Sequence, residues 1–292
     1  PPAVLVHNSR SRKDQPSSMT YNPTPDAPPP LAPHPVLTKY YTDEPARKRR
    51  VNQLFNASAQ HYDWITSMMS FGSGHRYRRG ALRRHGLKPG MSLLDVGAGT
   101  GVISLLGQEM VGPDDYVAAL DPSQGMLDVA KHKGVHNIFV GRGECIPFED
   151  DRFDLLTMGY ALRHVEDLRR TFTEYLRVLK PGARVLLLEI TSPRTGLGYQ
   201  LLKFYLKYVI PLISRIFRRS ADASVMMSYY WDTIENCVPP ETILAALRDA
   251  GFDEPRREVV AGIFSEYTGT KPRPILDSGR RESGTVRAVV ES

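Results

Sequence analysis

Three glycines at alternate positions, directly after a short apolar run, restrict this chain more than any other feature of its sequence. The stretch Leu93–Gly101 reads Leu-Leu-Asp-Val-Gly-Ala-Gly-Thr-Gly, with Asp95 two residues before the first glycine. Glycine tolerates a positive φ and leaves room for a ligand against the backbone. Because a helical pattern follows over residues 102–110, the stretch predicts a strand that ends in a tight, ligand-binding turn.

The spacing of Gly97, Gly99 and Gly101 distinguishes between two kinds of ligand. The dinucleotide-binding fingerprint G-x-G-x-x-G requires its third glycine at position 102, where this chain has valine. A G-x-G-x-G loop with an acid two residues before it instead resembles motif I of the class I methyltransferases, which bind S-adenosylmethionine (SAM). The resemblance implies that Asp95 and the three glycines frame a SAM-binding loop.

A second carboxylate, Asp121, supports this prediction. It ends the apolar run Tyr116–Leu120, about 20 residues after the glycines, where the second strand of a nucleotide-binding βαβ unit places an acid for ribose hydroxyls. A charged carboxylate accepts such hydrogen bonds strongly. The alternative is that Asp121 caps a helix, because Pro122-Ser123 opens the next helical segment.

Strand and helix patterns alternate along the centre of the chain. We predict strands near residues 92–96, 116–120, 137–141, 154–159, 183–190, 256–261 and 263–268. We predict helices over most of residues 46–88, near 100–110, 123–132, 166–179 and 197–218, and from Pro240 to about Ala250. The segment Val178–Gly182 is expected to end the helix at 166–179. The predicted fold class is α/β: a Rossmann-like, mostly parallel sheet of seven strands with N-terminal helices and an inserted lid helix.

The two ends of the chain differ in composition from its centre. Ten of the 23 prolines lie in the first 35 residues, and the sequence turns polar after about residue 271. We therefore expect a disordered proline-rich leader over residues 1–45, a methyltransferase domain over 46–270 and a polar tail over 271–292. The leader does not have the pattern of a signal peptide.

Cysteine content and charge limit the class of protein. Two distant cysteines, Cys145 and Cys237, are too few for a disulfide framework or a cysteine-based zinc site, so we expect no metal and a reducing, cytoplasmic compartment. No apolar run reaches the length of about 18 residues typical of a transmembrane helix. The net charge of +6 gathers in basic clusters that suit nucleic acid, lipid headgroups or a solvated face. These clusters are Arg47–Arg50, Arg76–Arg84 and Arg215–Arg219.

Nucleic acid is the less favoured of these partners. Enzymes that methylate amino groups of bases usually have an Asn/Asp-Pro-Pro-aromatic motif after the fourth strand, where this chain reads Met158–Ala161. Cytosine C5 methylation usually requires a Pro-Cys nucleophile, and neither cysteine follows a proline. These observations favour a small-molecule acceptor.

Short blocks outside the glycine loop carry a more specific resemblance. The most discriminating blocks are Tyr62-Asp63, Leu162-Arg163 and Tyr208–Ile213, and Glu144–Phe148 is another. Over residues 47–270 the chain resembles the UbiE-like ubiquinone/menaquinone biosynthesis methyltransferases. The resemblance implies methyl transfer from SAM to a ring carbon of a polyprenylated quinol.

The resemblance also implies two sets of site residues. In the cofactor set, Asp121 holds the ribose and Met126 packs near the adenine; its members are Asp95, Gly97, Gly99, Gly101, Asp121, Met126 and Glu144. Near the acceptor, Tyr62 covers the site and Arg163 lies beside the substrate. The other residues expected at the acceptor are Tyr160, His164 and Tyr229.

Several positions depart from the family pattern, and among them Thr66 and Tyr77 replace a common asparagine and a common tryptophan. The family usually reads Gly-Asp-Ala-Glu where this chain has Gly141–Glu144, so Arg142 replaces the aspartate that meets the adenine amine. His164 stands where asparagine is common, and Met227 replaces the first residue of a Tyr-x-Tyr pair that ends at Tyr229. The methyl donor therefore follows from the sequence more directly than the acceptor does.

His164 and Arg163 are the predicted catalytic pair. A quinol carbon becomes nucleophilic as a ring hydroxyl loses its proton, and a histidine titrates near neutral pH, so His164 is the candidate base. Arg163 is expected to stabilise the phenolate. The alternatives are that His164 is exposed at a helix start and that Arg163 pairs with Glu166 or Asp167.

The basic, apolar segment Leu201–Arg219 predicts an interfacial helix or a lid over an isoprenoid tail, with a kink at Pro211. Its first half fits a core helix equally well. We therefore expect an isoprenoid acceptor and peripheral contact with a membrane, and a homodimer is compatible with the sequence. Two other functions stay open: O- or N-methylation of another small metabolite, and a non-catalytic SAM-fold subunit of a biosynthetic complex.

Overall fold

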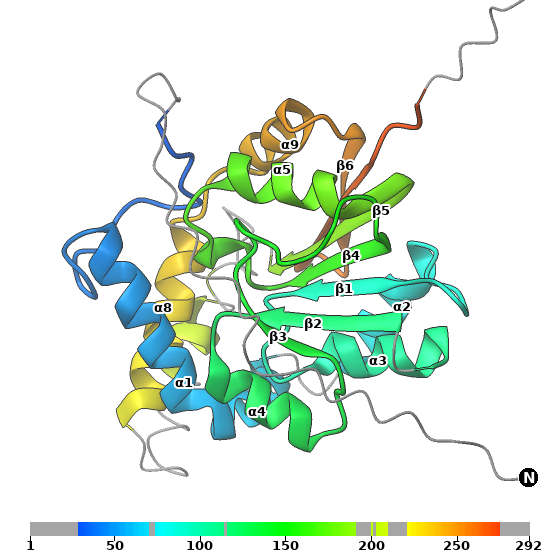
Figure 1. Ribbon diagram of the computed structural model, residues 1–292. Helices are drawn as coiled ribbons and strands as arrows, with labels where there is room; N and C mark the ends of the chain where they lie inside the picture. Colours follow the sequence, from blue (N-terminus) through cyan, green and yellow to red (C-terminus); the bar gives the residue numbers. More distant parts are fainter. Residues whose placement is uncertain are drawn as a thin grey trace, which may run out of the picture.

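A seven-stranded sheet forms the centre of the protein (Figure 1). The computed structural model describes residues 29–69, 74–113, 116–190, 200, 203–209 and 221–274. The strands are β1 (Leu93–Val96), β2 (Val117–Asp121), β3 (Ile138–Val140), β4 (Phe153–Gly159), β5 (Leu179–Ile190), β6 (Asp253–Val260) and β7 (Phe264–Thr270). Their order is β3-β2-β1-β4-β5-β7-β6. Strands β1 to β5 are parallel and β7 is antiparallel to both neighbours, which confirms the predicted sheet.

Helices cover both faces of this sheet and extend beyond one end of it (Figure 1). The α-helices are α1 (Glu44–Met69), α2 (Gly74–Arg84), α3 (Val102–Val111), α4 (Gln124–His132), α5 (Leu168–Val178), α8 (Ala221–Glu235) and α9 (Pro240–Asp249). Helices α2 and α3 pack on one face, and α5 and α9 on the other. Helices α1 and α8 contact each other beyond the carboxyl ends of β1 and β2, and this end of the sheet holds the candidate site.

The central strands are apolar because both of their faces are covered. All four residues of β1 and all five of β2 are buried, as expected for parallel strands between two layers of helices. Two of the following helices begin at a side-chain cap: Ser123 accepts a hydrogen bond from the Met126 amide at the start of α4, and Asp167 caps α5. Pro240 is the first residue of α9, as predicted.

Three segments differ from the sequence-based expectation. Helix α5 ends at Val178, as predicted, but strand β5 begins directly at Leu179, which pairs with Phe153, rather than near residue 183. Helix α8 has no counterpart among the predicted elements. Residues 29–43, which we assigned to a disordered leader, pack against the domain, and His34 and Tyr41 are buried there.

The predicted lid helix over residues 197–218 lies mostly outside the described residues. Within it the structure describes η3 (Tyr205–Val209), a π-helical turn. None of the described helices has the length and apolar character needed to cross a membrane.

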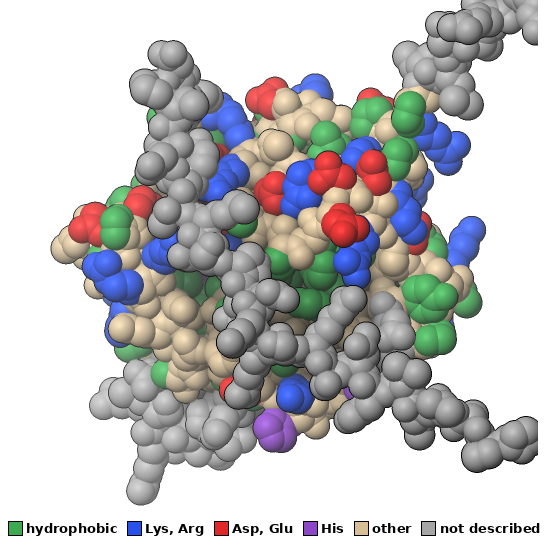
Figure 2. Space-filling model, in the orientation of Figure 1, with side chains coloured by type: hydrophobic (Ala, Val, Ile, Leu, Met, Phe, Trp, Pro, Cys, Tyr) green, Lys and Arg blue, Asp and Glu red, His purple; other side chains and the backbone are tan. Residues whose placement is uncertain are grey.

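Acidic side chains accompany the basic ones on the described surface drawn in Figure 2. Arg177 forms ion pairs with Asp150 (2.8 Å) and Glu174 (2.9 Å), and Lys271 pairs with Asp151 (2.7 Å). Such mixed charges are typical of a solvated face.

Candidate active site

A cavity of about 730 Å³ lies at the carboxyl ends of β1, β2 and β4. Its volume falls within the range of about 300–1,000 Å³ that is usual for small-molecule sites. The strand order reverses between β1 and β4, and open α/β sheets bind ligands at such a switch point. One wall of the cavity consists of the loops after these strands, and the opposite wall includes residues of α1 and Tyr230 of α8.

The glycine loop after β1 has the conformation that its sequence predicts. Gly97, Gly99 and Gly101 have φ values of 65°, 56° and 79°. A Cβ atom on Gly97 would lie 2.6 Å from the Cβ of Ala161, closer than van der Waals contact allows. Gly97 and Gly99 line the cavity, whereas Gly101 lies at the N-cap of α3. The loop therefore presents bare backbone to a ligand at two of its three glycines.

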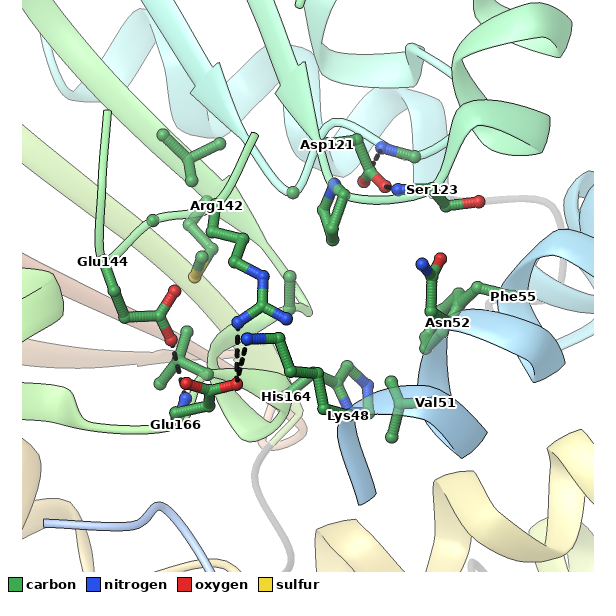
Figure 3. Close-up of a pocket in the computed structure, with 18 of the residues that line it drawn as sticks. Lys48, Val51, Asn52, Phe55, Asp121, Ser123, Arg142, Glu144, His164 and Glu166 are labelled. Atoms are coloured by element: carbon green, nitrogen blue, oxygen red, sulfur yellow. Dashed lines mark hydrogen bonds and ion pairs between the residues drawn. The ribbon is translucent and has the colours of Figure 1, made fainter. Parts of the chain in front are cut away.

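Asp121 lies at the edge of this cavity with both carboxylate oxygens held in place. Oδ1 accepts a hydrogen bond from the Ser123 amide and Oδ2 accepts one from the Gly99 amide, each at 2.8 Å (Figure 3). A carboxylate has about four acceptor sites, so each oxygen can accept a further bond from ribose. Burial raises the pKa of Asp121 to about 6. Ser123, not Asp121, caps α4, so the helix-cap alternative is wrong.

The bare glycine backbone and the oriented carboxylate fit the adenosyl part of SAM. A Cβ atom on Gly99 would point towards the Tyr62 ring, 4.0 Å away, and would partly fill the space between the loop and α1. The residues present thus leave room for the cofactor and offer it hydrogen-bond acceptors.

Asp95 lies beneath the loop and does not line the cavity. Its oxygens accept hydrogen bonds from the hydroxyls of Ser104 (2.7 Å) and Thr157 (3.0 Å), so this carboxylate joins β1, α3 and β4. Burial raises its pKa to about 6, although the two hydroxyls act in the opposite direction. Met126 is also buried and does not line the cavity, in contrast to its predicted place beside the adenine.

Glu166 joins α1 to the loop after β3 at another part of the cavity wall. Its carboxylate pairs with Arg142 (2.7 Å) and Lys48 (3.4 Å), and its amide donates to Glu144 (2.6 Å), as Figure 3 shows. Burial acts to raise the pKa of Glu166, but the two cations outweigh it and hold the pKa below its usual value. Arg142, which replaces the aspartate common in the family, therefore donates a hydrogen bond to Glu166 along this wall.

His164 ends the short 3₁₀ helix η2 (Leu162–His164) and lines the cavity. Its Nδ1 lies 3.3 Å from the Tyr229 hydroxyl, and its Nε2 is buried with no hydrogen-bond partner among the described residues. The Phe55 ring packs edge-on against the imidazole at 5.1 Å. Burial, with help from the charges of Arg163 and Arg47, lowers the pKa of His164 well below 6.5. The histidine is therefore half-buried and neutral at pH 7, contrary to the alternative of an exposed helix start.

Arg163 points away from the cavity and is fully buried. Its Nε donates to Glu189 and one Nη to Thr233, each at 2.9 Å, and further bonds reach the carbonyls of Tyr230 and Tyr160. Neither Glu166 nor Asp167 is the partner, so the predicted alternative pairing is wrong. The guanidinium joins the ends of β4 and β5 to α8 behind the cavity wall.

The tyrosines divide into two layers. Tyr62 and Tyr230 share a hydrogen bond between their hydroxyls and line the cavity, as does Tyr160. Tyr160 has a φ of 61°, an uncommon conformation for a residue with a side chain and one that occurs often at functional sites. Tyr229 is completely buried behind His164 and does not line the cavity.

Sequence reasoning missed several residues of this wall. Their shared property is that long-range packing, rather than a local motif, brings them to the cavity: Lys48, Asn52, Phe55 and Tyr230. A helical pattern over residues 221–235 would have separated Tyr230 from Tyr229, since adjacent helical residues point about 100° apart.

Comparisons with known proteins agree with this fold and site. Residues 43–271 match the model of the ubiE/COQ5 methyltransferase family. The chain is 32% identical over 243 residues to the ubiquinone/menaquinone biosynthesis C-methyltransferase UbiE of Geobacter sulfurreducens, covering 80% of this chain and 93% of that protein. It is 32% identical over 236 residues to a demethylmenaquinone methyltransferase of Staphylococcus saprophyticus, covering 78% of this chain and 99% of that protein.

Solved structures resemble the fold at lower sequence identity. A SAM-dependent methyltransferase of Thermotoga maritima has a TM-score of 0.52 and 19% identity, covering 75% of this chain and 98% of its own. Phosphoethanolamine N-methyltransferase 2 of Haemonchus contortus, in complex with SAM, has a TM-score of 0.54 and 18% identity, covering 75% of this chain and 57% of its own. Together with the family match over residues 43–271, these findings show that the chain belongs to the ubiE/COQ5 family and is a SAM-dependent methyltransferase.

Proposed function

We propose that this enzyme transfers the methyl group of SAM to a ring carbon of a quinol in quinone biosynthesis. The relatives described above support this acceptor, because one is named a C-methyltransferase of ubiquinone and menaquinone biosynthesis and the other a demethylmenaquinone methyltransferase. The observation that carries the proposal is His164, a neutral histidine whose buried Nε2 has no partner among the described residues and which lines the cavity.

The glycine loop and Asp121 are the proposed cofactor site. Gly97 and Gly99 give the adenosyl group access to the backbone, and Asp121 accepts hydrogen bonds from ribose hydroxyls. Glu144 lies further along the same wall and completes the cofactor side. Bound SAM supplies an electrophilic methyl group on a sulfonium, so these residues must hold the methyl in line with the acceptor carbon.

The acceptor side has the composition that an aromatic ring requires. Val51, Phe55, Tyr62, Tyr160 and Tyr230 contribute apolar surface to the cavity. His164 would accept at Nε2 the proton of a ring hydroxyl, which increases electron density on the ring carbon that attacks the methyl group. The methylated carbon then loses its hydrogen as a proton, and the hydroxyl regains its proton from His164, so the quinol ring is restored. Arg163 acts from behind the wall by fixing the segment that carries His164.

A membrane-bound isoprenoid tail is part of the same proposal. Phe204 and Tyr208 are more than half exposed on the described segment 203–209, and their ring centroids lie 5.9 Å apart. Exposed aromatic side chains of this kind insert readily at a membrane interface. We therefore propose that the enzyme acts at a membrane surface, where a prenylated acceptor would be available.

A turnover assay tests this function directly. The enzyme is incubated with SAM and a prenylated, demethylated benzoquinol or naphthoquinol under reducing conditions, and the product is analysed by mass spectrometry and NMR. We expect the product to gain one methyl group on a ring carbon. A methyl group found on oxygen or nitrogen would contradict C-methylation, and binding of S-adenosylhomocysteine without turnover of either quinol would favour a non-catalytic subunit.

Asp121→Asn is expected to raise the Kd for S-adenosylhomocysteine by about 10- to 100-fold, because the charged acceptor for ribose is lost. The carboxylate is the binding form, and its pKa is about 6, so wild-type affinity should fall as the pH decreases below 6. The Kd should be about tenfold higher at pH 5 than at pH 7, and Asp121→Asn should abolish this dependence. Calorimetric titration measures both effects.

Asp128→Asn provides the matched control, because Asp128 is an exposed carboxylate on α4 outside the cavity. It should keep wild-type affinity and wild-type pH dependence. A Kd of Asp121→Asn within about twofold of wild type at pH 7 would remove Asp121 from the cofactor site.

A further inference from the structure

The described segment that precedes α1 crosses the outside of the domain as a strap, which we define as residues 29–42. It lies entirely before the family-matched region, which begins at residue 43. The Leu31 amide donates to Asp167 (3.1 Å), and the Leu31 carbonyl accepts from the Leu168 amide (2.9 Å). The Pro33 carbonyl accepts from the Val238 amide (2.8 Å). The strap thus joins the start of α5 to the link between α8 and α9.

The second half of the strap packs on α8 through its aromatic side chains. The Tyr40 hydroxyl donates to Asp232 (2.7 Å), and the Tyr40 ring packs edge-on against Tyr229, with centroids 5.2 Å apart at 84°. Tyr41 makes a more distant edge contact with the same ring, at 6.5 Å. Asp232 follows Tyr229 by almost one helical turn, so Tyr40 is attached to α8 at two points of one face.

Tyr229 is enclosed between the strap and His164. Its other side stacks on the imidazole, with centroids 5.5 Å apart at 24°, and its hydroxyl lies 3.3 Å from Nδ1 of His164. In the tautomer that leaves Nε2 free to accept a proton, Nδ1–H donates to the Tyr229 oxygen. A displacement of Tyr229 would therefore change both the orientation of the imidazole and its preferred tautomer.

We propose that Tyr40 is a positioning residue for methyl transfer, which acts by holding Tyr229 against Nδ1 of His164. The inference rests on the proposed role of His164 as the base. Tyr40 touches neither the cavity nor the glycine loop, so its effect is separate from cofactor binding. A residue of the strap, outside the region that the family model matches, thus stabilises the position of His164 on the acceptor side.

The test compares Tyr40→Ala with Lys39→Met. Lys39 pairs with the same Asp232 carboxylate (3.0 Å), and its side chain is 64% exposed. Its loss removes this surface ion pair and a cation–π contact with the Tyr40 ring (4.9 Å), but leaves the contact between the Tyr40 and Tyr229 rings in place. We expect Tyr40→Ala to lower kcat about tenfold, since small misplacements of catalytic groups have effects of this size or larger. The Kd for S-adenosylhomocysteine should stay within about twofold of wild type, and Lys39→Met should match wild type in both measurements.

A second readout follows the histidine itself. The ¹⁵N resonances of His164, assigned by their loss in His164→Ala, should report Nδ1 protonated in wild type and a mixture of tautomers in Tyr40→Ala. Tyr229→Phe removes the hydroxyl that Nδ1 faces. If Tyr40 acts through Tyr229, adding Tyr40→Ala to Tyr229→Phe should lower kcat little further.

Unchanged His164 resonances in Tyr40→Ala would overturn the proposal, as would a full additional loss of kcat in the Tyr229→Phe background. Where Tyr40→Ala does not fold, Tyr40→Leu keeps the apolar volume and provides the same comparison. Failure of the proposed function gives a different result: His164→Ala would retain activity while Tyr40→Ala still shifted the His164 resonances.

Discussion

Replacing Arg163 by methionine is expected to lower the free energy of unfolding by about 3–5 kcal/mol, the usual cost of removing one partner of a buried ion pair. Arg163 is 1% exposed and its partner Glu189 is 4% exposed. Among the described residues, the Glu189 carboxylate would keep only its bond from the Leu162 amide (3.1 Å), and the bond to Thr233 would also be lost. Urea denaturation followed by circular dichroism measures the change.

Two further variants separate the charge from the packing. Adding Glu189→Gln to Arg163→Met removes the unpaired charge, so the double variant should recover about 1–3 kcal/mol. Arg256→Met is the matched control, because Arg256 pairs with Glu254 at a site where both side chains are exposed, and it should change stability by less than about 0.5 kcal/mol. A loss of similar size in Arg256→Met and Arg163→Met would contradict the role of the buried pair.

His164→Ala is expected to lower kcat by about 10²- to 10⁴-fold, the range for loss of a general base. The Kd for S-adenosylhomocysteine should change little, because His164 lies outside the glycine loop and makes no hydrogen bond with Asp121. His164→Asn places an amide at the same position, where it keeps hydrogen bonding and loses the base, so its kcat should also fall. Rate measurements at saturating SAM, with binding measured separately, distinguish the two effects.

The pH dependence of the wild-type enzyme follows from the lowered pKa of His164. The neutral imidazole is the active form, so kcat should be retained as the pH decreases to 6.5 and should fall only as the pH passes through the lower pKa of the folded enzyme. His164→Asn should lack this acidic limb. If His164→Ala lowered kcat and cofactor affinity equally, or left kcat within about twofold of wild type, His164 would not be the base.

The parts of the site that the sequence predicted are those that local backbone geometry determines. The glycine loop directly follows a short strand, and Asp121 ends the next one. The spacing of the glycines predicts the turn, and the distance in sequence from the glycines to Asp121 predicts an acid at the end of the second strand. The central part of the sheet was predictable for the same reason, because β1, β2 and β4 are short, mostly apolar runs.

The parts that the sequence did not predict depend on packing between distant segments. Helix α8 is buried over much of its circumference, including Met226, Tyr229 and Trp231, so it lacks the polar face that makes a helix periodic. The pairing of Arg163 with Glu189 joins the end of β5 to η2, and nearer acids in the sequence were equally plausible partners. The orientation of α8 about its own axis directs Tyr230 towards the cavity and leaves Tyr229 behind His164.

The separation of the two cavity walls has an evolutionary consequence. The methyl-donor wall belongs to loops that close the strands, so changes there disturb the sheet itself. The opposite wall comes largely from α1, with Tyr230 of α8, and both helices extend beyond the sheet (Figure 1). Mutations on those helices can therefore alter the acceptor side of the cavity while the donor loops and the folded sheet stay unchanged.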